Sequence, residues 1–200
     1  MEKALLSAAI AAVAEALIAA ADELTALDQA IGDGDHGINM KRGAEAVLAE
    51  RESLAEKPAG AAIKAAGTIL VMKVGGASGP LYGTLLMSLG KSWPESLDRE
   101  SFAGALETAV AAVMARGKSK VGQKTLLDVL VPVSAAVTAG RDLREIATAA
   151  GAAAAATVAL QAERGRASFL GERSVGHMDP GARSSEIAIR ALVDVLEQAA

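Results

Sequence analysis

The sequence predicts an all-α protein with a single domain, residues 1–200, built as a bundle of about eight antiparallel helices. Apolar residues make up 52% of the chain, but aromatic residues contribute only 2%. Such a core is filled by small and aliphatic side chains, and alanine has the highest helix propensity. A β-sandwich would require more aromatic and β-branched residues. No linker or internal repeat divides the chain, and its 200 residues suit one domain.

Four helices are expected in the first half of the chain. Apolar residues recur at helical spacing, and each helix ends where glycine or proline interrupts this pattern. Gly32, Gly34 and Gly37 follow the first helix, and Pro80 suits the first turn of the fourth. The β-branched stretch 68–71 in the third helix also permits a strand. The expected helices cover residues 6–27, 40–54, 61–74 and 80–89.

Four more helices are expected in the second half. Thr125 and Asp128 resemble a capping box, and Asp142 with Glu145 forms a similar start signal. Pro132 falls inside the helix that begins at Thr125, and it predicts a kink or a later start. The last helix is expected to begin with an N-cap and a proline after the irregular residues 165–177. These helices cover residues 98–116, from 125 onward, 142–163 and from 180 to the C-terminus.

Charge, cysteine content and hydropathy exclude several classes of protein. The net charge is −4 with both signs mixed, so no basic surface for nucleic acid or anionic membranes is expected. The absence of cysteine excludes a disulfide scaffold and thiolate metal sites. The N-terminus has no basic leader, and the longest uncharged run, residues 146–162, is shorter than the about 20 apolar residues of a membrane span. We therefore expect a soluble, cytoplasmic protein.

Residues 28–39 are the strongest candidate site, because Asp28, Asp33 and Asp35 lie close together among glycines. Neighbouring carboxylates repel one another, and a bound dication removes this repulsion. Oxygen ligands suit Mg²⁺ or Ca²⁺ rather than zinc. The alternative is that these aspartates only cap turns and the following helix.

An EF-hand does not fit the spacing of these aspartates. The bidentate Glu that closes such a loop would fall at Ala44 if the loop began at Asp33, and at Asn39 if it began at Asp28. A few carboxylates with open coordination positions are instead typical of Mg²⁺ whose shell is completed by phosphates. The spacing therefore favours a hard dication that binds a phosphorylated ligand.

Three segments carry a resemblance to a known family. Residues 27–40 read LDQAIGDGDHGINM, residues 75–83 read GGASGPLYG, and residues 165–182 read GRASFLGERSVGHMDPGA. Together with residues 116–118 and 122–128, they resemble the L subunit, the nucleotide-binding part, of dihydroxyacetone kinases. The resemblance covers nearly the whole chain in order.

This resemblance implies an eight-helix barrel in which the three aspartates hold two Mg²⁺ ions that bridge the phosphates of ADP or ATP. It also implies that Arg166 is a catalytic residue that contacts the phosphates and the charge that develops during transfer. Leu126 stands where family members have Met, a change that keeps the adenine end of the pocket apolar. The implied nucleotide-binding residues are His36, Gly37, Ile38, Asn39, Ala77, Ser78, Gly117, Leu126, Arg166, Asp179, Pro180 and Gly181.

Several of these residues have simpler interpretations. A glycine-rich stretch such as residues 75–80 often marks a close helix crossing, and it lacks the Lys-Ser/Thr of a Walker A motif. An arginine such as Arg166 is usually a solvated surface residue. His36 is expected to orient other groups, with a role as phosphoryl acceptor as the alternative.

The resemblance implies a phosphotransferase subunit that needs a partner. The ketose substrate would be bound covalently, through a histidine, on a separate K subunit. Either ATP is an exchangeable substrate, or bound ADP is recharged by a phosphohistidine protein of the phosphotransferase system. A homodimer is a further open possibility. The alternatives are a non-catalytic helical module that binds a metal, and a Mg²⁺-dependent phosphohydrolase that acts alone.

Overall fold

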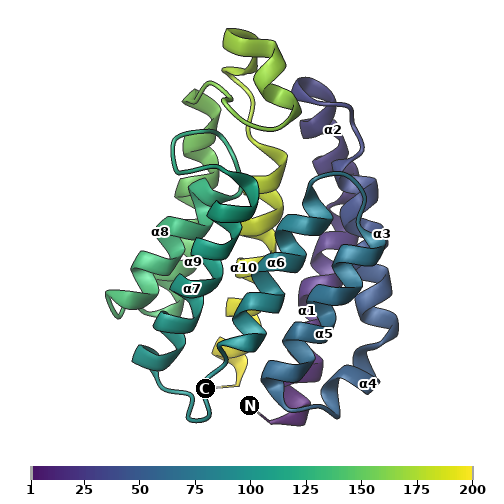
Figure 1. Cartoon of the computed structure of the whole chain (residues 1–200), viewed down its shortest axis with the longest axis vertical. Helices are drawn as coiled ribbons and strands as arrows, with labels where there is room; N and C mark the ends of the chain where they lie inside the picture. The colour runs from purple at the N-terminus through teal and green to yellow at the C-terminus, as the bar shows by residue number, and fades with distance from the viewer. Residues whose placement is uncertain (1, 200) are drawn as a thin grey trace.

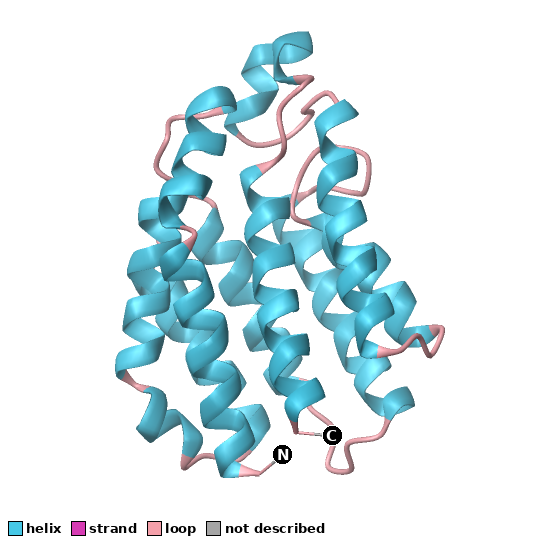
Figure 2. Ribbon diagram, turned by 180° about the vertical axis from the view of Figure 1, so that it is seen from behind, coloured by secondary structure: helices cyan, strands magenta, loops and turns pink. Residues whose placement is uncertain are grey.

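The computed structural model describes residues 2–199, and within them it contains ten α-helices, two 3₁₀ helices and no strand (Figures 1 and 2). The stretch 68–71 is helical, so its interpretation as a strand is wrong. The α-helices are α1 (Lys3–Ala19), α2 (Ala21–Ile31), α3 (His36–Ala49), α4 (Arg51–Ala55), α5 (Ala59–Lys73), α6 (Ser78–Lys91), α7 (Arg99–Gly117), α8 (Leu127–Thr138), α9 (Leu143–Ala156) and α10 (Pro180–Gln198), and the 3₁₀ helices are η1 (Thr157–Ala159) and η2 (Arg166–Ser174).

Eight of these helices form a closed antiparallel ring, which confirms the expected architecture. Neighbours in the ring are α1, α3, α5, α6, α7, α8, α9 and α10, and α10 packs against α1 to close it. Inside the ring lies a cavity of about 1080 Å³, lined by apolar side chains of α1, α3, α5, α6 and α10. Among residues 2–199 no single helix is long and apolar enough to cross a membrane, and only the bent pair α1 and α2 passes on length and composition together.

Two expected helices are broken, which is why the α-helices outnumber the eight predicted. The first helix bends by 53° after Ala19, and its second part, α2, continues past Asp28 to Ile31. The second helix divides at Glu50 into α3 and the short α4. Asp28 therefore lies in the last turn of α2 rather than after its end.

Helix α3 begins at His36 rather than at Met40. The Asp28 carboxylate accepts hydrogen bonds from the backbone N–H groups of Asp35 (2.8 Å) and His36 (3.1 Å). It thereby satisfies N–H groups that have no partner within a helix. Because this acceptor belongs to another helix, local sequence signals do not reveal the earlier start.

Helix α9 ends at Ala156 rather than at Glu163, and η1 follows it. Two contacts hold Thr157 at this point, one to its backbone carbonyl and one to its side-chain hydroxyl. The Thr157 carbonyl accepts a hydrogen bond from the Lys124 ammonium (2.7 Å), and the Thr157 hydroxyl accepts one from the Asp179 N–H (3.0 Å). These contacts turn the chain toward the segment that precedes α10.

The start signals of the second half are confirmed in two cases of three. Asp142 and Glu145 form a capping box, and Asp179 caps α10 through the Ala182 N–H, 2.7 Å away. Helix α8 instead begins at Leu127, and Asp128 accepts from the backbone N–H of Thr125 without a complete box. Residues 165–177 are not wholly irregular, because the 3₁₀ helix η2 forms within them.

All connections that carry candidate site residues lie at one end of the barrel. The ends of the described chain lie at the opposite end (Figure 1). Figure 2 shows the same arrangement from behind, with loop segments at both ends of the barrel and long ones at the site end. The alternation of antiparallel helices thus brings together four segments that are distant in sequence: residues 32–35, 74–77, 118–126 and 157–179.

Candidate functional site

The three aspartates of the predicted metal site converge. One carboxylate oxygen from each of Asp28, Asp33 and Asp35 lies within 4.8 Å of the other two. Asp28 is buried, whereas Asp33 and Asp35 face solvent. A side chain at Gly32 would overlap the Asp28 carboxylate, and Gly34 has a positive φ of 75° that favours glycine. The glycines therefore allow the tight turn that places the carboxylates together.

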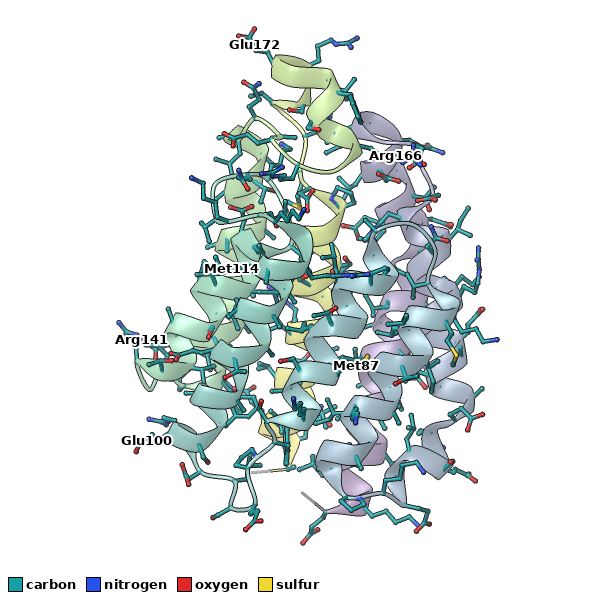
Figure 3. All side chains as sticks on the ribbon, in the orientation of Figure 1. Met87, Glu100, Met114, Arg141, Arg166 and Glu172 are labelled. Atoms are coloured by element: carbon teal, nitrogen blue, oxygen red, sulfur yellow. The ribbon has the colours of Figure 1, made fainter. Side chains whose placement is uncertain are left out.

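Arg166 reaches this cluster from the far end of the sequence. Its Nε lies 2.8 Å from an oxygen of Asp33, and its side chain remains 71% exposed. Figure 3 shows Arg166 and Glu172 at the site end of the barrel, on the segment that contains η2. An exposed ion pair of this kind adds little stability, so Arg166 is free to exchange its partner for an anionic ligand. This position agrees with the role expected for Arg166.

His36 lies beneath the cluster and is buried. Its Nδ1 is 3.0 Å from the Ser78 hydroxyl, and its Nε2 is 2.9 Å from the Ser184 hydroxyl. Burial lowers the pKa of His36, against the raising effect of the carboxylates of Asp28 and Asp35. Both ring nitrogens thus have partners in the protein, which favours an orienting role over that of a phosphoryl acceptor.

Three helices begin around the site: α3 at His36, α6 at Ser78 and α10 at Pro180. Helix N-termini carry partial positive charge, which suits phosphate oxygens. Some of their N–H groups already have partners, because Asp28 accepts from the His36 N–H at the start of α3 and Asp179 accepts from the Ala182 N–H in α10.

Between α5 and α6, a Cβ on Gly75 would stand 2.7 Å from the Asn39 side chain, so this loop lies directly against α3. Ala77 is exposed and Ser78 half-buried at the same end. The stretch does mark a close approach of the backbone, because a Cβ on Gly79 would overlap the Val74 carbonyl oxygen, and it also leaves Ala77 accessible at the site end.

The residues expected at the adenine end also approach one another. A Cβ on Gly181 would lie 3.6 Å from the backbone nitrogen and the Cβ of Leu126. Leu126 and Asp179 are buried, and Gly117 is the last residue of α7. Burial raises the pKa of Asp179 to about 7. The structure thus brings Leu126 together with the start of α10, whereas a Cβ on Gly117 would meet Leu81 of α6 at 3.3 Å.

Two of the expected nucleotide-binding residues, Ile38 and Gly37, point in different directions. The Ile38 side chain is 56% exposed on the first turn of α3. Gly37 faces α2, because a Cβ there would overlap the backbone oxygen of Ala21. Any contact of Gly37 with a ligand is therefore limited to its backbone.

Two buried residues beside the site were given no role by the sequence analysis. Lys124 is 1% exposed and donates hydrogen bonds to the carbonyls of Thr157, Leu160 and His177. Tyr82 is 8% exposed and contacts the start of α10 through its hydroxyl. Both lie in the segments that carry the family resemblance, but nothing in their spacing distinguishes them from surface or core residues.

Fold and site define a class: an all-helical barrel domain with a carboxylate cluster and three helix N-termini at one end. Comparison with known proteins narrows the class to a family. The DAK2 domain matches residues 30–194, and the chain belongs to this family.

Similar proteins include separate subunits of bacterial kinases. The chain is 45% identical to the PEP-dependent dihydroxyacetone kinase 1, ADP-binding subunit DhaL, of Listeria innocua, over 85% of each chain. It is 40% identical to the PEP-dependent dihydroxyacetone kinase, ADP-binding subunit DhaL, of Escherichia coli, over 80% of this chain and 81% of that one.

Among solved structures, the dihydroxyacetone kinase of C. freundii in its native form matches 96% of this chain with a TM-score of 0.78 and 25% identity. The present chain spans only about a third (34%) of the length of that kinase.

Proposed function

We propose that this chain is the nucleotide-binding subunit of a dihydroxyacetone kinase. It holds Mg²⁺ with ADP or ATP and passes the phosphoryl group to a ketose bound on a separate K subunit. The observation that carries this proposal is the cluster of Asp28, Asp33 and Asp35, with Arg166 at its edge and three helix N-termini around it. The relatives that match most of the chain are named as ADP-binding kinase subunits.

The donor set fits Mg²⁺ because it consists of carboxylate oxygens within 4.8 Å of one another, with positions left for other ligands. Asp28, Asp33 and Asp35 would hold two ions, which neutralise phosphate charge when bound. The protein's own groups position the nucleotide. Backbone N–H groups at the starts of α3 and α6 donate to phosphate oxygens, and Ser78 adds a hydroxyl.

Arg166 supplies the catalytic charge in this proposal. Its planar guanidinium pairs with Asp33 at 2.8 Å and is exposed enough to turn toward a terminal phosphate. A forked cation stabilises the charge on the equatorial oxygens of a phosphoryl group in transfer. At the other end of the nucleotide, Gly117 and Leu126 would contact adenine, and Asp179, Pro180 and Gly181 would line the pocket.

We further propose that ADP stays bound as a coenzyme. The two relatives described above are named PEP-dependent, which agrees with recharging by a phosphohistidine protein of the phosphotransferase system. When bound, ADP would serve as the carrier that accepts a phosphoryl group from the phosphohistidine and gives it to a ketose hydroxyl on the K subunit, which would lose its proton in the transfer. Ser78 and Arg166 would hold the phosphates of this carrier. The cytoplasmic location stays a prediction.

Calorimetry tests the metal and nucleotide assignment. After bound nucleotide has been removed with EDTA, ADP is expected to bind the full chain in Mg²⁺ and not in EDTA, and Asp33→Asn and Asp35→Asn are each expected to abolish this binding. Asp22→Asn is the matched control, because it makes the same charge change at an exposed position of α2. Binding of ADP that neither site variant changes would refute the metal assignment.

Two further measurements separate the alternatives. Native mass spectrometry of the purified chain is expected to show bound ADP, which supports the coenzyme cycle. Steady release of phosphate from ATP by the isolated chain would instead indicate a phosphohydrolase. Binding of Ca²⁺ or Mg²⁺ without any nucleotide binding would indicate a non-catalytic metal module.

A further inference from the structure

A chain of buried hydroxyl and imidazole groups runs beneath the candidate site. It begins at Tyr82, one turn after Ser78 on α6, and the tyrosine hydroxyl lies 2.9 Å from the Gly181 carbonyl. The same hydroxyl lies 2.8 Å from the hydroxyls of both Ser184 and Ser185 on α10. Tyr82 thus joins α6 to the first two turns of α10.

The chain continues from Ser184 back to Ser78. The Ser184 hydroxyl is 2.9 Å from His36 Nε2, and His36 Nδ1 is 3.0 Å from the Ser78 hydroxyl. Tyr82, His36 and Ser184 are all buried, whereas Ser78 is half-buried at the end of the chain. The connected groups therefore link the starts of α6, α10 and α3, the three helix N-termini that surround the site.

From this arrangement we infer that Tyr82 is a positioning residue for the nucleotide. Through Ser184 and His36 it orients the Ser78 hydroxyl, and through the Gly181 carbonyl it sets the opposite wall of the site. The inference rests on the proposed function, because it assigns a task to residues that the proposal places around Mg-ADP. Tyr82 itself contacts neither the metal cluster nor the ligand.

The hydroxyl of Tyr82 is well suited to this task. Burial raises its pKa to about 12, so it keeps its proton at physiological pH. A phenol has one proton to donate and accepts further bonds, so its neighbours at 2.8–2.9 Å must adopt complementary orientations. Linked hydrogen bonds of this kind restrict the orientation of every group they contain.

The fold is expected to tolerate removal of the Tyr82 hydroxyl, because other hydrogen bonds hold the start of α10. Without the Tyr82 hydroxyl, the Ser185 hydroxyl can donate its proton to the Gly181 carbonyl at 2.8 Å, and the Ser184 hydroxyl can donate to the Pro180 carbonyl at 3.0 Å. Tyr82→Phe keeps the aromatic ring in the core. The variant is therefore expected to fold, and its main defect concerns the orientation of the groups above it.

The test measures Mg-ADP affinity of the full chain by calorimetry, after bound nucleotide has been removed with EDTA, together with the melting temperature. We expect Tyr82→Phe to bind Mg-ADP about 5- to 10-fold more weakly, the effect of losing one ordering hydrogen bond. Ser134→Ala is the control, because the Ser134 hydroxyl on α8 is buried and has no hydrogen-bond partner among the described residues. Its Mg-ADP affinity is expected to equal that of the wild type.

Ser184→Ala and the double variant distinguish positioning from general destabilisation. Because both substitutions interrupt the same chain, the double variant is expected to lose no more affinity than the weaker-binding single variant. The inference would be overturned if the fold-losses of Mg-ADP affinity in the two single variants multiply in the double variant. It would also be overturned if Tyr82→Phe binds Mg-ADP with an affinity within twofold of that of the wild type. If Tyr82→Phe does not fold, unchanged affinity in Ser184→Ala overturns it alone. Absence of Mg-ADP binding in the wild type would instead refute the proposed function.

Discussion

Lys124 provides the sharpest test of how the site end is held together. Its ammonium is buried and donates to three backbone carbonyls: Thr157 at 2.7 Å, Leu160 at 3.0 Å and His177. These carbonyls flank the segment that carries Arg166. Lys124→Met removes all three hydrogen bonds and keeps the length of the side chain.

The cost of this substitution follows from two opposing contributions. Each hydrogen bond from a charged donor contributes about 1.5–3 kcal/mol, and removal of the donor leaves buried carbonyls without that partner. Against this, burial of the charge is unfavourable, as the lowered pKa of Lys124 shows, although the carboxylates of Asp179 and Asp128 raise it in part. Three such hydrogen bonds, reduced by the unfavourable burial of the charge, lead us to expect a loss of about 3–5 kcal/mol for Lys124→Met.

Urea and thermal unfolding measure this loss. For a chain of this length, a loss of about 3–5 kcal/mol corresponds to a fall in melting temperature of about 6–20 °C. Lys118→Met is a close control, because Lys118 is exposed and both lysines have a positive φ, 49° and 60°. The control is expected to change stability by less than about 0.5 kcal/mol. Equal stability of the two variants would refute the structural role of Lys124.

Two further predictions concern packing and pH. Gly37→Ala is expected to destabilise the protein by about 2–4 kcal/mol, because the added Cβ would overlap the Ala21 carbonyl. Gly104→Ala on α7 is the control: its Cβ would meet nothing within 4 Å, and the substitution is expected to stabilise the protein by about 0.5–1 kcal/mol. Denaturant unfolding of both variants checks this pair, and similar effects at the two glycines would contradict it. The Asp179 carboxyl has a pKa of about 7 in the folded protein and an ordinary value of 3.8, so between these values the folded state binds more protons than the unfolded state. Stability is therefore expected to fall by about 2–4 kcal/mol as pH rises from about 4 to 7, and Asp179→Asn is expected to show a smaller fall. Parallel pH dependences of the two proteins would show that Asp179 does not titrate in this way.

Local sequence signals predicted the features that local chemistry controls. Asp142 with Glu145, and Asp179 with Pro180, start helices through contacts between residues within three positions of each other, and both starts are confirmed. The acidic loop was predicted for the same reason. Asp28, Asp33 and Asp35 are close in the chain, and the glycines between them permit a tight turn.

Features that depend on contacts between different structural elements were predicted incorrectly or were missed. Helix α3 starts early because Asp28 of α2 caps it, and α9 stops early because Lys124 occupies the Thr157 carbonyl. The role of Tyr82 was missed because its partners are about a hundred residues later in the chain. None of these contacts leaves a periodic or short-range pattern in the sequence.

By itself, the sequence determined an all-helical domain, a cluster of three carboxylates and the family to which the chain is similar, because composition, short spacings and ordered motifs carry that information. Only the tertiary structure decided that Arg166 meets Asp33 and that three helices start around the cluster. Closure of the antiparallel ring collects alternate connections at one end of the barrel. That closure is driven by burial of apolar surface from all eight helices, and it is therefore a property of the whole chain rather than of any segment.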